Sequence, residues 1–232
     1  KLTEQLGQHI IYENRGGGGG VLAGEIVARA APDGYTLLCG AVGVMTVTGN
    51  LMKMPFDPVR DFLPVGQMVR IPFVLVVHPS MPAKTVKEFV ALAKSRPGNM
   101  NYSSSGNGGT GHLAMEMLKL AADVNIAHIP YKGAGPAVTA LVAGEVVTSI
   151  TNLIAAMPMV KAHRMRVIAV TSGKRSIALP DVPTVAEAGY AGFDASGWFA
   201  VYAPSKSPRQ IIVRLNEDFR SVLRLADVQQ GL

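Results

Sequence analysis

Asn101-Tyr-Ser-Ser-Ser-Gly-Asn-Gly-Gly-Thr-Gly-His112 is the stretch of sequence that decides the fold. The pattern predicts a short strand over residues 101–103 before the glycine-rich segment and an apolar helix over residues 111–121 after it. Small residues between the two elements allow the backbone to approach a bound group closely. A strand, a glycine-rich loop and a helix in this order are typical of the βαβ units of α/β proteins.

The alternation of strands and helices continues on both sides of this loop. The run Phe73-Val-Leu-Val-Val-His78 is almost continuously apolar, as expected for a strand that is covered on both faces of its sheet. We predict strands at residues 9–13, 35–40, 73–78, 101–103, 127–130, 146–151, 167–171 and 198–203. We predict helices at residues 22–31, 85–96, 111–121, 135–143, 156–162 and 208–225. This order predicts an α/β fold with mainly parallel sheets.

The elements separate into two blocks, from which we predict two lobes. Residues 1–101 plus 203–232 form the first lobe, and residues 102–202 form the second. Residues 1–7 have the pattern of the last turns of a helix that is closed by Gly7. We therefore expect a further strand and loop before residue 1.

Composition and charge argue against several classes of protein. The net charge is +6, but Lys and Arg form no dense run and aromatic residues are only 6% of the chain, so we expect no nucleic-acid partner. The sequence contains no run of 18 apolar residues and is not expected to be membrane-embedded. Cys39 is the single cysteine and lies in an apolar run, where we expect a buried small hydrophobic residue.

The glycine-rich loop is also the strongest candidate for a binding site. Free N–H groups at the start of a helix, together with the hydroxyls of Ser103, Ser104, Ser105 and Thr110, can bind an anion. An ordinary strand-to-helix turn with a Ser/Thr cap explains the spacing equally well. The loop matches neither a dinucleotide fingerprint nor a phosphate-binding P-loop, because it lacks the Gly-Lys-Ser/Thr and no acidic residue closes the following strand.

Enzymatic signatures are absent from the sequence. The histidines have no metal-ligand spacing, no Gly-x-Ser-x-Gly elbow occurs, and the loop serines have no identifiable His/Asp partners. We therefore expect no catalytic residue, no metal and no cofactor.

Several stretches, taken together and in order, resemble one known family. They are residues 6–8, 13–15, 31–38, 55–58, 61–62, 103–108, 112–114, 130–134, 169–172 and 179–189. This set is similar to the Bug-type receptors, which are the substrate-binding proteins of tripartite tricarboxylate transporters. Any one motif is weak, whereas the ordered set covers essentially the whole chain.

The resemblance implies a two-lobed fold like that of the type II periplasmic binding proteins, which close on a ligand like a Venus flytrap. It implies a bacterial extracytoplasmic, periplasmic protein that captures a small carboxylate between two lobes. The ligand would be a di- or tricarboxylate, an acidic amino acid or an aromatic acid. The protein would be a monomer that delivers this ligand to the membrane subunits of a transporter. The ligand-binding residues implied are Ser103, Ser104, Ser105, Asn107, Gly108, Thr110, His112, Ala41, Tyr131, Gly133, Thr151 and Asn152.

Some residues depart from the family pattern. The family usually has an Asp-Asn pair where this chain has Thr151-Asn152, and an Asp at the position of Val147. These changes leave the identity of the ligand open. Two alternatives from other classes remain: an enzyme with a glycine-rich anion-binding loop, and the effector-sensing domain of a transcription regulator.

Overall fold

A computed structural model describes residues 1–231 of the chain and divides it into two compact units. Unit 1 contains residues 1–70 and the segment that begins at residue 198, and unit 2 contains residues 71–197. The predicted lobe boundaries near residues 101 and 202 differ from these. Strand β3 (Phe73–Val77) and helix α4 (Val86–Ser95), which we assigned to the first lobe, lie in unit 2. The reason is that β3 pairs with two strands of that unit and α4 packs into the same core.

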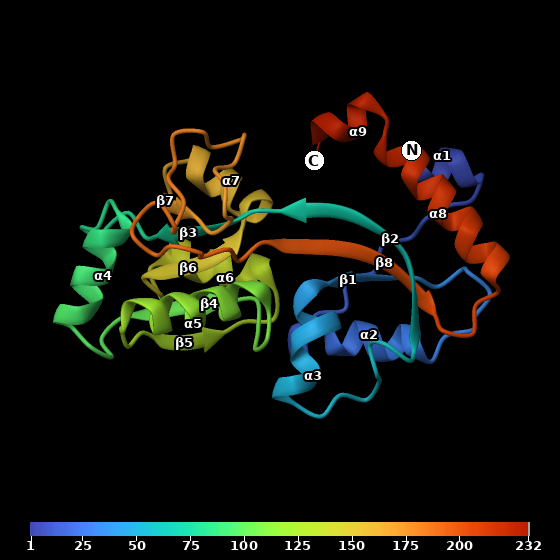
Figure 1. Cartoon of the computed structure of the whole chain (residues 1–232), viewed down its shortest axis with the longest axis horizontal. Coiled ribbons are helices and arrows are strands. Elements are labelled where there is room, and N and C mark those ends of the chain that lie inside the picture. The colour runs from blue at the N-terminus through green and yellow to red at the C-terminus, as the bar shows by residue number, and fades with distance from the viewer. Residues whose placement is uncertain (232) are drawn as a thin grey trace. The chain divides into compact units, whose positions relative to one another are not determined.

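Unit 1 is built on a three-stranded sheet with the order β1-β8-β2 (Figure 1). Its strands are β1 (Leu38–Ala41), β2 (Phe62–Ile71) and β8 (Gly197–Pro204). Its helices are α1 (Leu2–Leu6), η1 (Gly18–Gly20), α2 (Val21–Ala28), η2 (Gly43–Val47), α3 (Thr48–Leu51), α8 (Arg209–Leu223) and α9 (Ala226–Gly231). Helix α1 lies beside α8, and the Gln5 amide donates to the Asp218 carboxylate at 3.2 Å (Figure 1).

Three sequence predictions in unit 1 were wrong. Residues 9–13 are not a strand, because no described strand pairs with them and Ile11 and Tyr12 are exposed. Strand β2 was missed, because Pro64 and Gly66 interrupt it and its buried residues do not alternate. Cys39 is exposed, since the pleat of β1 turns Leu38 and Gly40 inward and Cys39 outward.

Unit 2 is built on a five-stranded sheet with the order β5-β4-β6-β3-β7. Its remaining strands are β4 (Asn101–Ser104), β5 (Ala127–Pro130), β6 (Thr148–Asn152) and β7 (Arg166–Val170). Its remaining helices are α5 (Thr110–Ala122), α6 (Ala134–Ala143) and α7 (Leu153–Lys161). Strand β4 is parallel to β5 and to β6, whereas β3 is antiparallel to both of its neighbours. Only β3 runs opposite to the other four strands, so two of the four strand pairings are parallel and two are antiparallel, and the prediction of a mainly parallel sheet holds in part.

Strand β3 is buried on both faces, as its apolar run predicted. Leu75 and Val77 belong to one hydrophobic cluster, and Val74 and Val76 belong to a second. The first cluster contains the buried side chains of α4 and α5, and the second contains those of α6 and α7. The alternation of side chains along a strand sends successive residues to opposite faces, so the two helix pairs cover opposite faces of this sheet. The architecture is the predicted α/β fold.

Candidate functional site

The Ser/Gly loop, residues 103–110, lies at the carboxyl ends of the adjacent parallel strands β5, β4 and β6 of unit 2. Helix α5 leaves β4 over one face of the sheet, and helix α6 leaves β5 over the other. Strand β4 lies between β5 and β6, so the chain goes to one side of β4 and then returns to its other side. In open α/β sheets, ligands bind at the carboxyl ends of the strands where the strand order reverses in this way.

The start of helix α5 has main-chain N–H groups without a hydrogen-bond acceptor in the described part of the chain. Gly109 is the N-cap residue and provides no side-chain cap, and the first helical bond runs from Leu113 N to Gly109 O. The amides of Thr110, Gly111 and His112 donate to no acceptor among residues 1–231. Such groups, at the positive end of a helix of 13 residues, favour an anion.

Two glycines give the loop the backbone shape that leads into helix α5. Gly106 has φ 131° and Gly108 has φ 75°, a region that side chains with a Cβ rarely adopt. The Gly109 amide donates to the Gly106 carbonyl at 3.2 Å and closes a turn just before the helix.

The hydroxyls of Ser103 and Ser104, both predicted to contact the ligand, have hydrogen-bond partners within the protein. The Ser103 hydroxyl is buried and donates to the Ala137 carbonyl at 2.9 Å. The Ser104 hydroxyl is also buried, accepts from the Gly106 amide at 3.2 Å and lies 2.6 Å from Nε2 of His128. These hydroxyls hold the loop together from within and are not available to a ligand in this arrangement.

Three other hydroxyls of the predicted site have no hydrogen-bond partner among the described residues. They belong to Ser105, Thr110 and Thr151. Ser105 and Thr110 are partly exposed in the loop, and Thr151, with 5% of its surface exposed, lies near the end of β6. Ser105 directly follows the last residue of β4, and Thr151 is the next-to-last residue of β6, which is parallel to β4 and adjacent to it. Ser105 and Thr151 therefore lie near the carboxyl ends of two neighbouring strands.

The remaining predicted residues have varied positions. Asn107 is exposed at the tip of the loop. The Gly133 amide donates to the Ser105 carbonyl at 3.1 Å and the Tyr131 amide to the Ser104 carbonyl at 3.0 Å, so both border the loop. The Asn152 side chain caps helix α7 by accepting from the Ala155 amide at 2.8 Å. Ala41 lies in β1 of unit 1, opposite Phe199.

Sequence reasoning missed two residues that shape the loop. His128 forms the contact to Ser104, and its ring stacks on that of His112 with centroids 4.2 Å apart. Gly111 lies so close to β6 that a Cβ atom there would overlap the Ile150 carbonyl oxygen. A glycine in the first turn of an otherwise apolar helix was the one available signal for Gly111.

The charges near the loop are compatible with an anionic ligand. No acidic residue occurs between Ser103 and Leu113. Glu116, one turn into α5, accepts from Lys119 at 2.7 Å and from the Tyr102 hydroxyl at 2.6 Å. Burial acts to raise the pKa of Glu116, but these two hydrogen bonds outweigh it and hold the pKa below its usual value. This carboxylate is therefore ionised and already paired.

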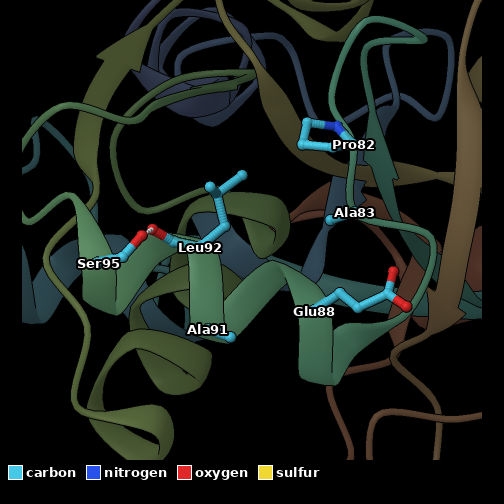
Figure 2. A pocket seen from close by; sticks show the side chains of 6 residues that line it. All are labelled: Pro82, Ala83, Glu88, Ala91, Leu92 and Ser95. Atoms are coloured by element: carbon cyan, nitrogen blue, oxygen red, sulfur yellow. Dashed lines mark hydrogen bonds between the residues drawn. The ribbon is translucent and has the colours of Figure 1, made fainter.

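A separate hollow lies on α4 and carries none of these features. Pro82, Ala83, Glu88, Ala91, Leu92 and Ser95 line it (Figure 2). The Glu88 carboxylate accepts from the Lys84 amide in a capping arrangement with Thr85. The Glu88 carboxylate is thus used to start the helix, and the Ser95 hydroxyl donates to the Leu92 carbonyl at 2.9 Å.

Within the described part of the chain, no three His, Cys, Asp or Glu side chains are close enough together to hold a metal ion. In the same residues, no helix combines the length and apolar character that crossing a membrane requires.

The chain matches a known protein family and several known sequences. The family described as "Tripartite tricarboxylate transporter family receptor" matches residues 1–232. The UPF0065 protein in the tcbD-tcbE intergenic region of Pseudomonas sp. strain P51 is 36% identical over 233 residues, covering 100% of this chain and 69% of that protein. Protein BugT of Bordetella pertussis is 37% identical over 225 residues, covering 96% of this chain and 69% of BugT.

Solved structures similar to this chain have the same fold. Rpa4515 of R. palustris with adipate has a TM-score of 0.96 at 36% identity and covers 100% of this chain and 78% of its own. MatC from Rhodopseudomonas palustris with bound malate has a TM-score of 0.94 at 33% identity, with coverage of 100% and 79%. The periplasmic binding protein BugD has a TM-score of 0.93 at 31% identity, with coverage of 99% and 77%.

Proposed function

Because this chain belongs to the tripartite tricarboxylate transporter receptor family, we propose that it captures a small carboxylate at the Ser/Gly loop and delivers it to transporter subunits in the membrane. The family is one of receptors, and the matched structures are solute-binding proteins, so the chain is a binding protein and not an enzyme.

The observation that carries the ligand assignment is the set of unused donors at the start of α5. The amides of residues 110–112 and the hydroxyls of Ser105, Thr110 and Thr151 are the candidate donors, and a subset of them would serve one carboxylate group. A carboxylate accepts up to about four hydrogen bonds, and each bond to a charged group is worth about 1.5–3 kcal/mol when its partner is removed. The similar proteins with adipate and with malate show carboxylic acids as ligands of this fold.

The proposed compartment is the bacterial periplasm. Among the similar proteins, BugD is a periplasmic binding protein, and a further structure with a TM-score of 0.96 is a periplasmic transporter. A receptor that serves a transporter in the inner membrane meets its ligand in this compartment.

Calorimetric titration of the protein tests the proposal. The panel consists of adipate, malate, citrate, glutamate and benzoate, with dimethyl adipate and adipamide as uncharged counterparts of adipate. We expect at least one acid of the panel to bind, and we expect its ester and amide to bind far more weakly, because they lack the charged oxygen atoms. Equal affinity for adipate and dimethyl adipate, or binding of the uncharged forms alone, would contradict an anion site.

A further inference from the structure

Three aromatic rings form a continuous stack beside the Ser/Gly loop. The Tyr102 ring of β4 lies on the His128 ring of β5 with centroids 4.7 Å apart and an angle of 22° between the planes. The His128 ring lies on the His112 ring of α5 with centroids 4.2 Å apart and an angle of 21°. The stack therefore links a strand, its neighbour and the helix that carries the unused amides.

Each histidine of this stack contacts one end of the loop. Nε2 of His128 lies 2.6 Å from the hydroxyl of Ser104, where the loop begins. Nδ1 of His112 accepts from the Gly108 amide at 3.1 Å, shortly before the helix begins. A main-chain amide can only donate, so Nδ1 of His112 must be unprotonated, and the neutral ring carries its proton on Nε2.

The surroundings keep both rings neutral at pH 7. Burial lowers the pKa of His112, and it lowers the pKa of His128 to about 4, with the neighbouring His112 ring adding to that effect. The other titratable groups at the stack are Tyr102 of β4 and Glu116 and Lys119 of α5. The Glu116 carboxylate opposes the lowering of both histidine pKa values, but it is itself paired with Lys119 and Tyr102.

We propose that His112 and His128 are positioning residues, whose neutral rings hold Gly108 and Ser104 so that the amides of residues 110–112 remain free for the ligand. This inference rests on the proposed carboxylate site and deepens it. Without His112, the Gly108 amide would be a further unpaired donor close to the helix. Its hydrogen bond to Nδ1 of His112 fixes the peptide plane between Asn107 and Gly108, shortly before the first turn of α5. Protonation of His112 at Nδ1 would remove the acceptor for the Gly108 amide and release that end of the loop, whereas a protonated His128 could still donate from Nε2 to the Ser104 hydroxyl oxygen.

The test uses variants that separate ring stacking from hydrogen bonding. His112→Phe keeps an aromatic ring in the stack and removes the acceptor for Gly108. His112→Asn restores an acceptor oxygen near the position of Nδ1. His9→Phe is the matched control, because His9 is exposed in an irregular segment of unit 1. For each protein we measure amide hydrogen exchange at Gly108 by NMR without ligand, and the affinity for malate and adipate by calorimetry.

We expect faster exchange at Gly108 and about fivefold weaker binding in His112→Phe, as the loss of one hydrogen bond of about 1 kcal/mol predicts. His112→Asn should recover part of both effects, and His9→Phe should match the wild type. Unchanged Gly108 exchange in a folded His112→Phe protein would overturn the proposal. A wild-type protein that binds neither acid would instead argue against the proposed function, while the exchange data would still decide the role of the ring.

Ring nitrogen chemical shifts of the wild-type protein provide a test that needs no folded variant. A neutral His112 with its proton on Nε2 at pH 7 supports the proposal. A proton on Nδ1 of His112 would exclude the bond to Gly108 and would overturn it.

Discussion

Gly111, in the first turn of helix α5, lies directly against the main-chain carbonyl oxygen of Ile150 in strand β6. This contact fixes the start of the helix, and with it the unused amides, against the end of a neighbouring strand. The space between them is too small for a Cβ atom.

Replacing Gly111 with alanine should therefore destabilise the protein. Alanine is favoured over glycine inside a helix by about 1 kcal/mol, so helix propensity alone would predict the opposite sign. The overlap with a main-chain oxygen outweighs this gain, because crowding a packed site costs about 1–3 kcal/mol. Urea unfolding of Gly111→Ala is the measurement.

Gly135→Ala is the matched control, since Gly135 lies in the first turn of α6 and a Cβ atom there meets nothing within 4 Å. We expect this variant to be as stable as the wild type or slightly more stable. A Gly111→Ala protein as stable as Gly135→Ala would show that α5 can shift freely on β6.

Removing the hydroxyls of the loop one at a time should lower stability for some of them and ligand affinity for others. Ser103→Ala removes a buried bond to Ala137 and should lower the unfolding free energy by about 1–3 kcal/mol. Thr110→Val and Ser105→Ala remove hydroxyls that have no partner among residues 1–231, so stability should change little. Affinity for a bound carboxylate should fall about tenfold in these two variants, at ~1.4 kcal/mol per decade. Thermal unfolding and calorimetry of each variant separate the two effects, and a Thr110→Val protein with unchanged affinity would remove that hydroxyl from the site.

Gly108→Val should weaken ligand binding more than any single hydroxyl change. Gly108 is buried and has φ 75°, and a β-branched residue adopts such a backbone only under strain. The new side chain would also lie next to the amides that are proposed to bind the ligand. Gly192→Val provides the comparison, because Gly192 has φ 79° but is exposed, with no atom within 4 Å of a Cβ. If both variants lose stability equally and both retain affinity, the effect is backbone strain alone.

The sequence predicted an element correctly where a local property, such as continuous apolar character, was enough to define that element. The apolar run of residues 73–77 predicted a strand covered on both faces, and β3 has this position. The apolar residues 10–12 led to a wrong prediction of a strand at residues 9–13, because a strand also needs a neighbour to pair with, and no local pattern reports that neighbour. The chain was divided at residue 101 for the same reason: the partners of β3 are β6 and β7, which come much later in the sequence.

Prediction of the candidate site from the sequence was limited in the same way, because long-range contacts are not visible in a local pattern. Composition correctly placed a glycine-rich loop between β4 and α5, but it could not tell which hydroxyls face inward. The Ser103 hydroxyl is hydrogen-bonded to Ala137 of α6, and the Ser104 hydroxyl to His128 of β5. The stack of Tyr102 on His128 likewise depends on the register of two parallel strands. Such contacts are set by tertiary packing, so their discovery required the structure.

The stability of the protein should fall as the pH is lowered from about 6.5 to about 4, in part because of His128. An unfolded histidine has a pKa of about 6.5, whereas burial holds the pKa of folded His128 at about 4. Between these values the unfolded chain binds more protons than the folded chain, so the unfolding free energy decreases as the pH falls. The lowered pKa of His112 acts in the same direction.

Urea unfolding at several pH values between 7 and 4 measures this effect. Carboxylates with lowered pKa values, such as Glu116, also destabilise the fold on acidification, so the wild-type slope alone does not isolate the histidine. His128→Phe should be less dependent on pH than the wild type over this window, although its absolute stability at pH 7 falls through the loss of the Ser104 contact. His9→Phe is the control for the loss of an exposed histidine outside the stack. Equal slopes for His128→Phe and wild type would mean that His128 takes up its proton without loss of folding free energy, and the ring would then not need to be neutral to hold the loop.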